Sequence, residues 1–224
     1  MYSEKTDKEL LEIMGHYHTL TFEAMTRLHG EMEQRKMVVD KTPLTAAITE
    51  RKQRIENLEL LPAMGFFATE DAAGALVVKR TLKAQVWDVL AVLVGLVVFL
   101  AGVYGCASLF SMFANGDEVN VFSLAVNLGM ASLVYLGFTM LQGLKRLVDF
   151  MGFKMVAQAG TVSLSKRFDM KLENVAKPSE AVGLEYQEET VALYLGDLPV
   201  FSANAGNTLQ KLTMEALAAR LHKS

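Results

Sequence analysis

Cysteine is nearly absent from this chain, and its scarcity limits the chemistry available. The single cysteine, Cys106, falls inside a long apolar stretch. A disulfide or a cysteine-based metal site within one chain needs more than one cysteine, so both are excluded. We interpret Cys106 as a small apolar residue of a helix.

The motifs of common enzyme classes are also missing. No glycine-rich loop follows a strand and opens a helix, which argues against dinucleotide and P-loop phosphate sites. No serine lies in a G-x-S-x-G turn. His16, His18 and His29 have no acidic or thiol partner at metal-binding spacing. We therefore expect no catalytic residue, no metal ligand, no cofactor and no enzymatic activity.

A basic surface for nucleic acid is lacking as well. The net charge is −3 at pH 7, and lysine and arginine form no stripe away from the apolar stretches. We expect no nucleic-acid partner.

Charge is wholly absent from two long stretches, Val89–Gly116 and Val119–Leu144. A helix rises about 1.5 Å per residue, so roughly 20 apolar residues cross a bilayer core. Both stretches exceed that length. They predict a membrane hairpin with spans at about 87–113 and 119–144.

The distribution of charge around these stretches predicts an orientation. The loop Asn115–Asn120 contains Asp117 and Glu118, whereas the outer flanks are basic: Lys79, Arg80, Lys83, Lys145, Arg146 and Lys154. Basic residues near short loops stay on the cytoplasmic side. We expect both termini in the cytoplasm, the first span acting as its own insertion signal, and a location in a membrane, that of the bacterial inner (plasma) membrane.

The cytoplasmic edge of the hairpin carries the candidate interface residues. Trp87 and Asp88 open the first span, and Lys83, Lys145 and Arg146 flank the two spans. Aromatic and ionisable groups at that depth are typical of interface anchors. We expect Asp88 to reach water or to pair with Arg80, Lys83 or the basic residues after the second span.

Small residues and one amide mark candidate packing faces in the spans. Ala101 and Gly105 are four residues apart in the first span, and Ala125 and Gly129 are four apart in the second. Such spacing lets helix backbones approach closely, first within the hairpin itself. Asn127 needs an interhelical partner, so it predicts a packed face.

The remaining chain predicts helices before the hairpin and a mixed domain after it. Residues 1–62 read as three cytoplasmic helices, the third capped by Thr42 with Pro43 at its first turn. Residues 63–83 form a short β-hairpin-like segment, and residues 84–146 form the transmembrane hairpin. Residues 147–224 form a small cytoplasmic α+β domain, helical to about Ala159 and then an antiparallel sheet with a C-terminal helix capped by Asn207.

This interpretation leads to three further expectations. The segment Phe66–Arg80 is too short to be stable alone, so we expect it to join the strands after Gly160 in one sheet. Pro199 cannot donate to a ladder and predicts an edge strand or a bulge. The apolar stripes of the second and third helices either pack on each other or dock on a partner.

Two family resemblances are faint. Lys79–Asp88 is similar to the Arg-to-Asp opening of the RDD family of membrane proteins, although the spacing is longer and the second span lacks the later aspartate. A membrane hairpin followed by strands and a closing helix looks a little like bacterial membrane-anchored PH-like domains, which would require strands from Phe66–Arg80. No residue role is carried over from either family.

Three function classes compete. The first is a non-catalytic scaffold or subunit that contacts membrane lipids and binds a protein partner or forms a homo-oligomer. The second is an oligomeric channel or transporter component lined by Asn120 and Asn127, and the third is an enzyme. The spans contain too few polar residues for a transport pathway, so the sequence favours the scaffold.

Overall fold

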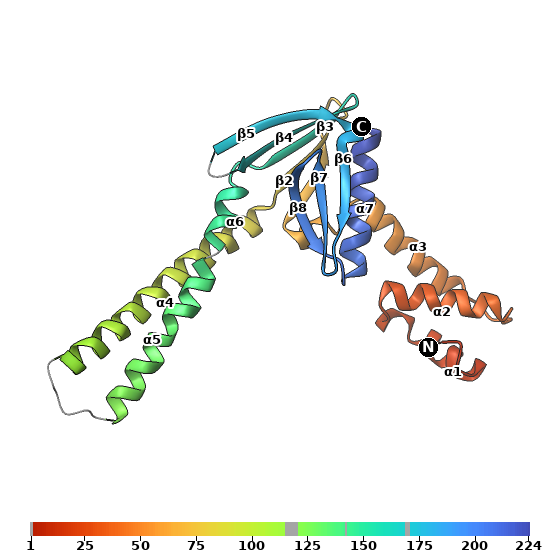
Figure 1. The fold of residues 1–224 in the computed structure, drawn as a ribbon. Coiled ribbons are helices and arrows are strands. Elements are labelled where there is room, and N and C mark those ends of the chain that lie inside the picture. The colour runs from red at the N-terminus through yellow and green to blue at the C-terminus, as the bar shows by residue number, and fades with distance from the viewer. Residues whose placement is uncertain (1, 115–120, 142, 169–170) are drawn as a thin grey trace. The chain divides into compact units, whose positions relative to one another are not determined.

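The computed structural model describes residues 2–114, 121–141, 143–168 and 171–224 (Figure 1). The loop Asn115–Asn120, expected outside the membrane, lies outside these residues. The chain divides into two compact units. Unit 1 comprises Met1–Val77, Ala157–Val162 and Lys177–Ser224, and unit 2 comprises Val78–Val156 and Ser163–Ala176. As predicted, the fold combines helices with antiparallel sheet.

All the regular elements in residues 2–64 of unit 1 are helices. Their apolar stripes meet in one buried cluster that includes Leu10, Met25, Leu28 and Leu44. The stripes of the second and third helices therefore pack within the chain. The elements are α1 (Asp7–Gly15), η1 (Tyr17–Thr19), α2 (Phe22–Gln34), α3 (Thr42–Glu56) and η2 (Leu61–Met64).

The start of α3 differs from the prediction by one residue. Lys41, not Thr42, is the N-cap, and its side chain makes no capping hydrogen bond. The Asp40 carboxylate instead accepts the Thr42 N–H at 3.0 Å. Hydrogen bonds from the Thr42 side chain and from this N–H group lower the pKa of Asp40. Thr42 was a plausible cap because Pro43 marks the first turn, but an aspartate before it takes the same role.

The segment Phe66–Arg80 joins a larger sheet, as expected. It forms β1 (Phe66–Glu70) and β2 (Leu76–Arg80), joined by a turn in which the Asp71 carboxylate accepts the Ala73 and Ala75 N–H groups at 2.9 Å. The five-stranded sheet has the order β1-β2-β3-β4-β5, with β3 (Lys154–Gln158), β4 (Thr161–Phe168) and β5 (Lys171–Pro178). The apolar helices are thus inserted between two neighbouring strands, β2 and β3.

Strand β3 corrects the prediction of a helix continuing to about Ala159. The helical region ends at α6 (Gly143–Asp149), and Gly152 adopts a positive φ of 83° before the chain becomes extended. Glycine adopts a positive φ more easily than other residues, so Gly152 favours the end of a helix at this point. Because β3 lies between β2 and β4, β2 does not pair directly with the strand after Gly160.

Unit 1 also contains a three-stranded antiparallel sheet in the order β6-β7-β8, formed by β6 (Val182–Tyr186), β7 (Thr190–Leu195) and β8 (Leu198–Asn204). A short helix, η3 (Ser179–Ala181), precedes it. Pro199 lies in the edge strand β8, beside a register shift at Leu193 and Tyr194. Both alternatives predicted for Pro199, an edge and a bulge, are confirmed.

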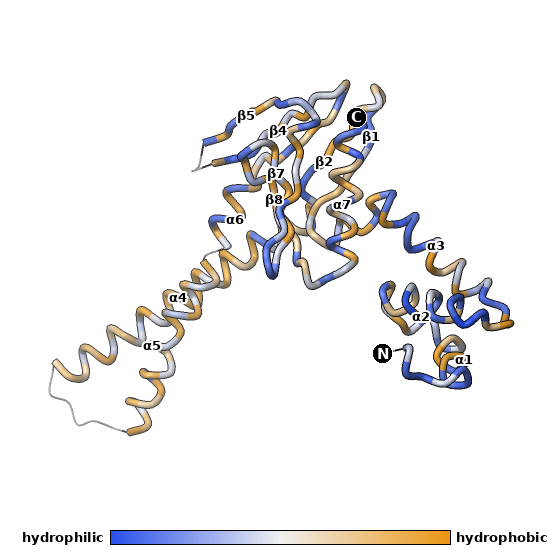
Figure 2. The backbone as a smooth tube through the Cα atoms, turned by 45° about the vertical axis from the view of Figure 1, so that its right-hand side comes forward, coloured by the Kyte–Doolittle hydropathy of each residue, from blue (hydrophilic) through white to orange (hydrophobic). Residues whose placement is uncertain are grey.

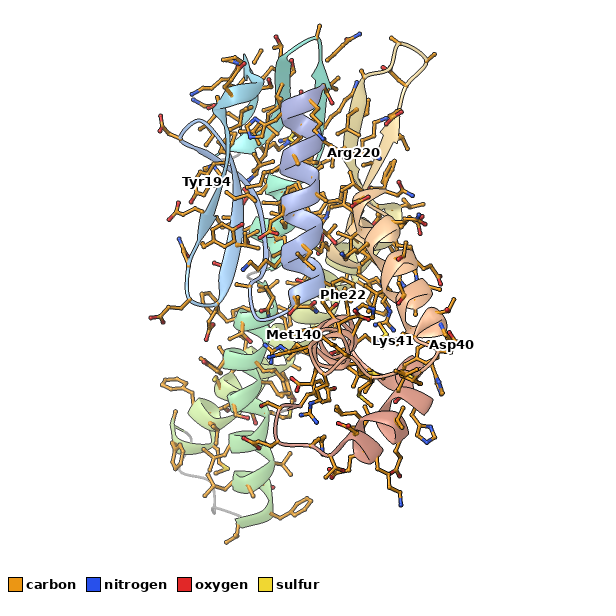
Figure 3. All side chains as sticks on the ribbon, turned by 90° about the vertical axis from the view of Figure 1, so that its right-hand side faces the viewer. Phe22, Asp40, Lys41, Met140, Tyr194 and Arg220 are labelled. Atoms are coloured by element: carbon orange, nitrogen blue, oxygen red, sulfur yellow. The ribbon has the colours of Figure 1, made fainter. Side chains whose placement is uncertain are left out.

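The chain ends in α7 (Thr208–Lys223), whose N-cap is Asn207 as predicted. The Asn207 side chain accepts the N–H groups of Leu209 and Gln210. Figure 3 shows Phe22 and Arg220 near opposite ends of this helix. Leu209 and Leu212 of α7 are partly buried and pack against the N-terminal cluster, so the first half of α7 contacts that core.

Unit 2 contains the two apolar helices, α4 (Leu82–Ala114) and α5 (Val121–Leu141). Figure 2 shows orange and pale residues along both, whereas α3 carries long blue segments. Within Leu82–Ala114 and Val121–Asp149, the 18-residue windows that identify a candidate span have mean hydropathies of 2.6 and 1.8. Both are long and apolar enough to cross a membrane.

Candidate functional site

A charged cluster lies in unit 2 where the polypeptide enters and leaves the apolar helices. Arg80 ends β2, and Thr81 then starts α4 by accepting the Ala84 N–H at 3.2 Å. Asp88 follows in the second turn of α4. The Arg80 Nη2 donates to Asp88 Oδ2 at 2.6 Å. The strand-to-helix junction therefore brings a cation and a carboxylate together across eight residues of sequence.

Asp88 also contacts the other end of the hairpin. Arg146 of α6 places its Nη2 3.2 Å from Asp88 Oδ1. Each carboxylate oxygen of Asp88 thus contacts one guanidinium group. The two arginines differ in environment, because the side chain of Arg80 is 2% exposed and that of Arg146 is 60% exposed.

Phe150, just after α6, extends the cluster. The Arg80 guanidinium carbon lies 4.8 Å from the centroid of its ring, and Lys166 Nζ of β4 lies 5.1 Å from the same centroid. Lys166 Nζ is also 5.2 Å from the Phe168 ring. These distances fall within the range of cation–π attraction, which contributes about 0.5–2 kcal/mol depending on desolvation.

Lys166 is 8% exposed, which is rare for a lysine. Burial lowers the pKa of its ammonium group below the ordinary 10.5, and the negative charge of Asp149 opposes this shift. The cluster thus contains three cationic side chains, Arg80, Arg146 and Lys166, and two carboxylates, Asp88 and Asp149.

This arrangement suits binding and positioning. Asp88 joins the start of α4 to β2 and to α6, so it fixes the base of the hairpin. Guanidinium groups and an ammonium group attract anions, and a guanidinium matches the geometry of phosphate. Among the described residues, no group of three or more His, Cys, Asp or Glu is placed to hold a metal ion.

The second candidate feature is the contact between α4 and α5. A Cβ at Gly105 would lie 2.6 Å from Met130 Cβ, and one at Gly137 would lie 2.5 Å from the Phe99 backbone. Real Cβ atoms do not approach so closely, so glycine is required at both. The contacts run antiparallel along the hairpin: Gly95 with Met140, Gly137 with Phe99, Gly102 with Val134 and Gly105 with Met130.

The predicted packing residues separate into two groups. Gly105 is buried in the α4–α5 contact, while Ala101 and Asn127 are half-buried. Ala125 and Gly129 are exposed, and a Cβ at Gly129 would meet no described atom within 4 Å. Gly129 therefore takes no part in the contact within the hairpin, which uses Gly137 of the same helix instead.

The predicted interface residues lie around the charged cluster. Asp88 and Arg146 belong to it, and Lys83, Lys145 and Trp87 have exposed side chains. Lys166 and Phe150 were missed from sequence. A signal for Lys166 was present, because Val162 and Leu164 precede it at alternate positions and all three are buried.

Comparisons with protein-family models, with curated proteins and with solved structures give no match to this chain.

Proposed function

We propose that this chain is an integral membrane protein that holds its sheet-containing parts at the surface of a bilayer and acts there as a non-catalytic scaffold or subunit. In this proposal α4 and α5 cross the membrane as a hairpin, and both termini lie in the cytoplasm. The protein contacts membrane lipids, and it binds a protein partner or further copies of itself.

The observation that carries the proposal is the exposed apolar surface of α4 and α5. Phe110, Phe122 and Tyr135 have exposed fractions of 76%, 75% and 76%. Soluble proteins rarely leave an apolar patch of more than a few hundred Å² uncovered. Most side chains of both helices point away from their mutual contact, and a lipid bilayer would cover them.

The position of the charged cluster supports the proposed orientation. Arg80 and Arg146 lie just outside the two apolar segments, at the ends remote from the 115–120 loop. Cationic groups at both outer ends favour the cytoplasmic side for those ends. Asp88, the carboxylate that they share, would lie at headgroup depth, where it does not enter the hydrocarbon.

A scaffold role agrees with the polarity of the helices. Between Val89 and Leu141 the described helical residues include no charged side chain. Ion and proton pathways in membranes are normally lined by such groups. The apolar stripes of α2 and α3 are used inside unit 1, so a protein partner would contact other surfaces.

Purification tests the proposal most broadly. The full-length protein should resist extraction from membranes at alkaline pH and should leave them in detergent. Mass determination of the purified particle, with identification of co-purifying proteins, should show an oligomer or a bound partner. A strict monomer without a partner would contradict the scaffold role, and release by alkali would contradict membrane insertion.

The channel alternative predicts a different particle. Several copies would surround a hydrated lumen, and Asn127→Leu would change conductance in a planar bilayer. Under the scaffold proposal Asn127→Leu leaves assembly intact and no conductance is measured, because even an interhelical hydrogen bond from an amide contributes only about 0.6–2 kcal/mol.

A further inference from the structure

We propose that Met151 and Leu172, two exposed apolar side chains outside the proposed spans, contact the headgroup layer of the bilayer that α4 and α5 cross. This inference rests on the proposed function, which supplies the bilayer. It adds a second, peripheral lipid contact that a membrane-spanning hairpin does not require. Through this contact the membrane holds the start of β5 directly, and not only through the hairpin.

The exposed apolar face of α4 does not end at the charged cluster. Five exposed side chains recur at intervals of three or four residues and so share one face of the helix: Leu82, Val86, Leu90, Leu93 and Val97. Leu82 is 74% exposed and lies six residues before Asp88, which is about 9 Å along the helix axis. The surface that lipid would cover therefore continues beyond the cluster.

Met151 lies at a similar level on the other side of the hairpin. The contact of 3.2 Å between Arg146 Nη2 and Asp88 Oδ1 fixes these two residues at one level. Met151 follows Arg146 by five residues, much as Leu82 precedes Asp88 by six. Met151 is 59% exposed. Both apolar side chains thus lie just beyond the ion pair, outside the spans.

Leu172 of β5 lies beside the same turn. A Cβ at Gly152 would lie 3.9 Å from Leu172 Cδ1, so Leu172 is next to the residue that follows Met151. Leu172 is nevertheless 51% exposed. Figure 1 and Figure 2 both show the start of β5 close to α6. Because side chains alternate across a strand, Glu173 lies on the opposite face of β5.

The continuity of these side chains with the apolar face of α4 commits the occupant to a lipid surface. Apolar side chains of interfacial segments enter the boundary of headgroups and acyl chains to a depth of about 5–10 Å. The distance of about 9 Å between Asp88 and Leu82 falls within that depth. Methionine and leucine gain by leaving water whatever the charge of the lipid, so we expect the contact in uncharged phosphatidylcholine.

Depth-dependent fluorescence quenching tests the proposal on the full-length protein in phosphatidylcholine vesicles. In a Cys106→Ala background, Leu172→Cys and Met151→Cys are labelled with bimane. The quencher is a nitroxide on the lipid headgroup, and iodide is the quencher in water. We expect both labels to lose most of their fluorescence to the headgroup nitroxide and little to iodide.

Glu173→Cys is the matched control, because Glu173 is exposed and adjacent to Leu172 but lies on the opposite face of β5. Its label should respond to iodide and only weakly to the headgroup nitroxide. Equal headgroup quenching at Leu172→Cys and Glu173→Cys would overturn the inference, as would strong iodide quenching at Leu172→Cys. Protection of Leu172→Cys from both quenchers would also overturn it, and would show that protein covers this side chain instead of lipid.

Val97→Cys separates this inference from the proposed function. Val97 lies within α4 and is 67% exposed, so its label should be quenched by a nitroxide on the acyl chain. If Val97→Cys is quenched in this way but Leu172→Cys is not quenched by the headgroup nitroxide, the hairpin enters the membrane and the peripheral contact is wrong. If neither label is quenched by lipid, both proposals fail.

Discussion

At the scale of single residues, the two ion pairs of Asp88 are unequal. Arg80 is buried and lies 2.6 Å from Asp88, whereas Arg146 is largely exposed at 3.2 Å. Removing one partner of a buried pair leaves the other charge poorly compensated and costs about 3–5 kcal/mol. An exposed pair contributes about 0–1 kcal/mol.

We therefore predict that Arg80→Gln lowers the free energy of unfolding by about 3 kcal/mol, the lower end of that range because Arg146 remains. Arg146→Gln should lower it by less than about 1 kcal/mol. Chemical denaturation in detergent measures both. Equal losses would show that burial does not distinguish the two arginines.

Lys166 gives a prediction about pH. Burial lowers its pKa in the folded protein below the 10.5 of the unfolded chain. Between those two values the unfolded state binds more protons, so stability rises as pH increases through this window. The thermal midpoint of the wild type, relative to that of Lys166→Met, should increase as pH is raised from neutral toward 10.5. Parallel curves for the two proteins would contradict the cost of burying this charge.

At the scale of elements, the contact between α4 and α5 depends on glycine at particular turns. Gly137 meets the Phe99 backbone, while Gly129, on the same helix, meets no described atom. Gly137→Leu should destabilise the hairpin by at least the 1–3 kcal/mol typical of overpacking. Gly129→Leu is the matched control and should leave the thermal midpoint unchanged.

A separate measurement of mass tests whether Gly129 contacts another copy of the chain. If it does, Gly129→Leu will dissociate an oligomer without unfolding the hairpin. If Gly129→Leu unfolds the protein as strongly as Gly137→Leu, the packing described for α5 is wrong.

The elements that the sequence predicted correctly have strong local signals. Asn207 caps α7, the pair Gly196 and Asp197 joins β7 to β8, and the apolar length of the two helices is unmistakable. Strand β3 was missed because five residues are too few to distinguish periods of two and 3.6. Strand β5 was missed because most of its side chains are exposed, so it has no apolar alternation.

The candidate site was predictable only in part for a similar reason. Asp88 and the basic flanks are visible in sequence because they interrupt or border apolar runs. The choice of Arg80 and Arg146 as partners, with Lys83 left exposed, depends on where β2 ends and α6 begins. Lys166 enters the cluster from β4 and Phe150 from the turn after α6, and no short-range pattern joins these two segments.

At the scale of the whole molecule, the central claim is that α4 and α5 cross a membrane and leave both termini on one side. The chain leaves the five-stranded sheet after β2 and returns to it as β3. A hairpin inserted between neighbouring strands must begin and end on the same side of a bilayer. Side chains of α7 pack against the cluster of the N-terminal helices, so the proposal expects both ends of the chain on one side of the membrane.

Accessibility of single cysteines in intact cells tests this claim most directly. In a Cys106→Ala background, Thr6→Cys, Lys223→Cys and Asp117→Cys are treated with a thiol reagent that does not cross membranes. The account predicts labelling of Asp117→Cys in intact cells, and labelling of Thr6→Cys and Lys223→Cys only after lysis. Labelling of either terminal position in intact cells would contradict it.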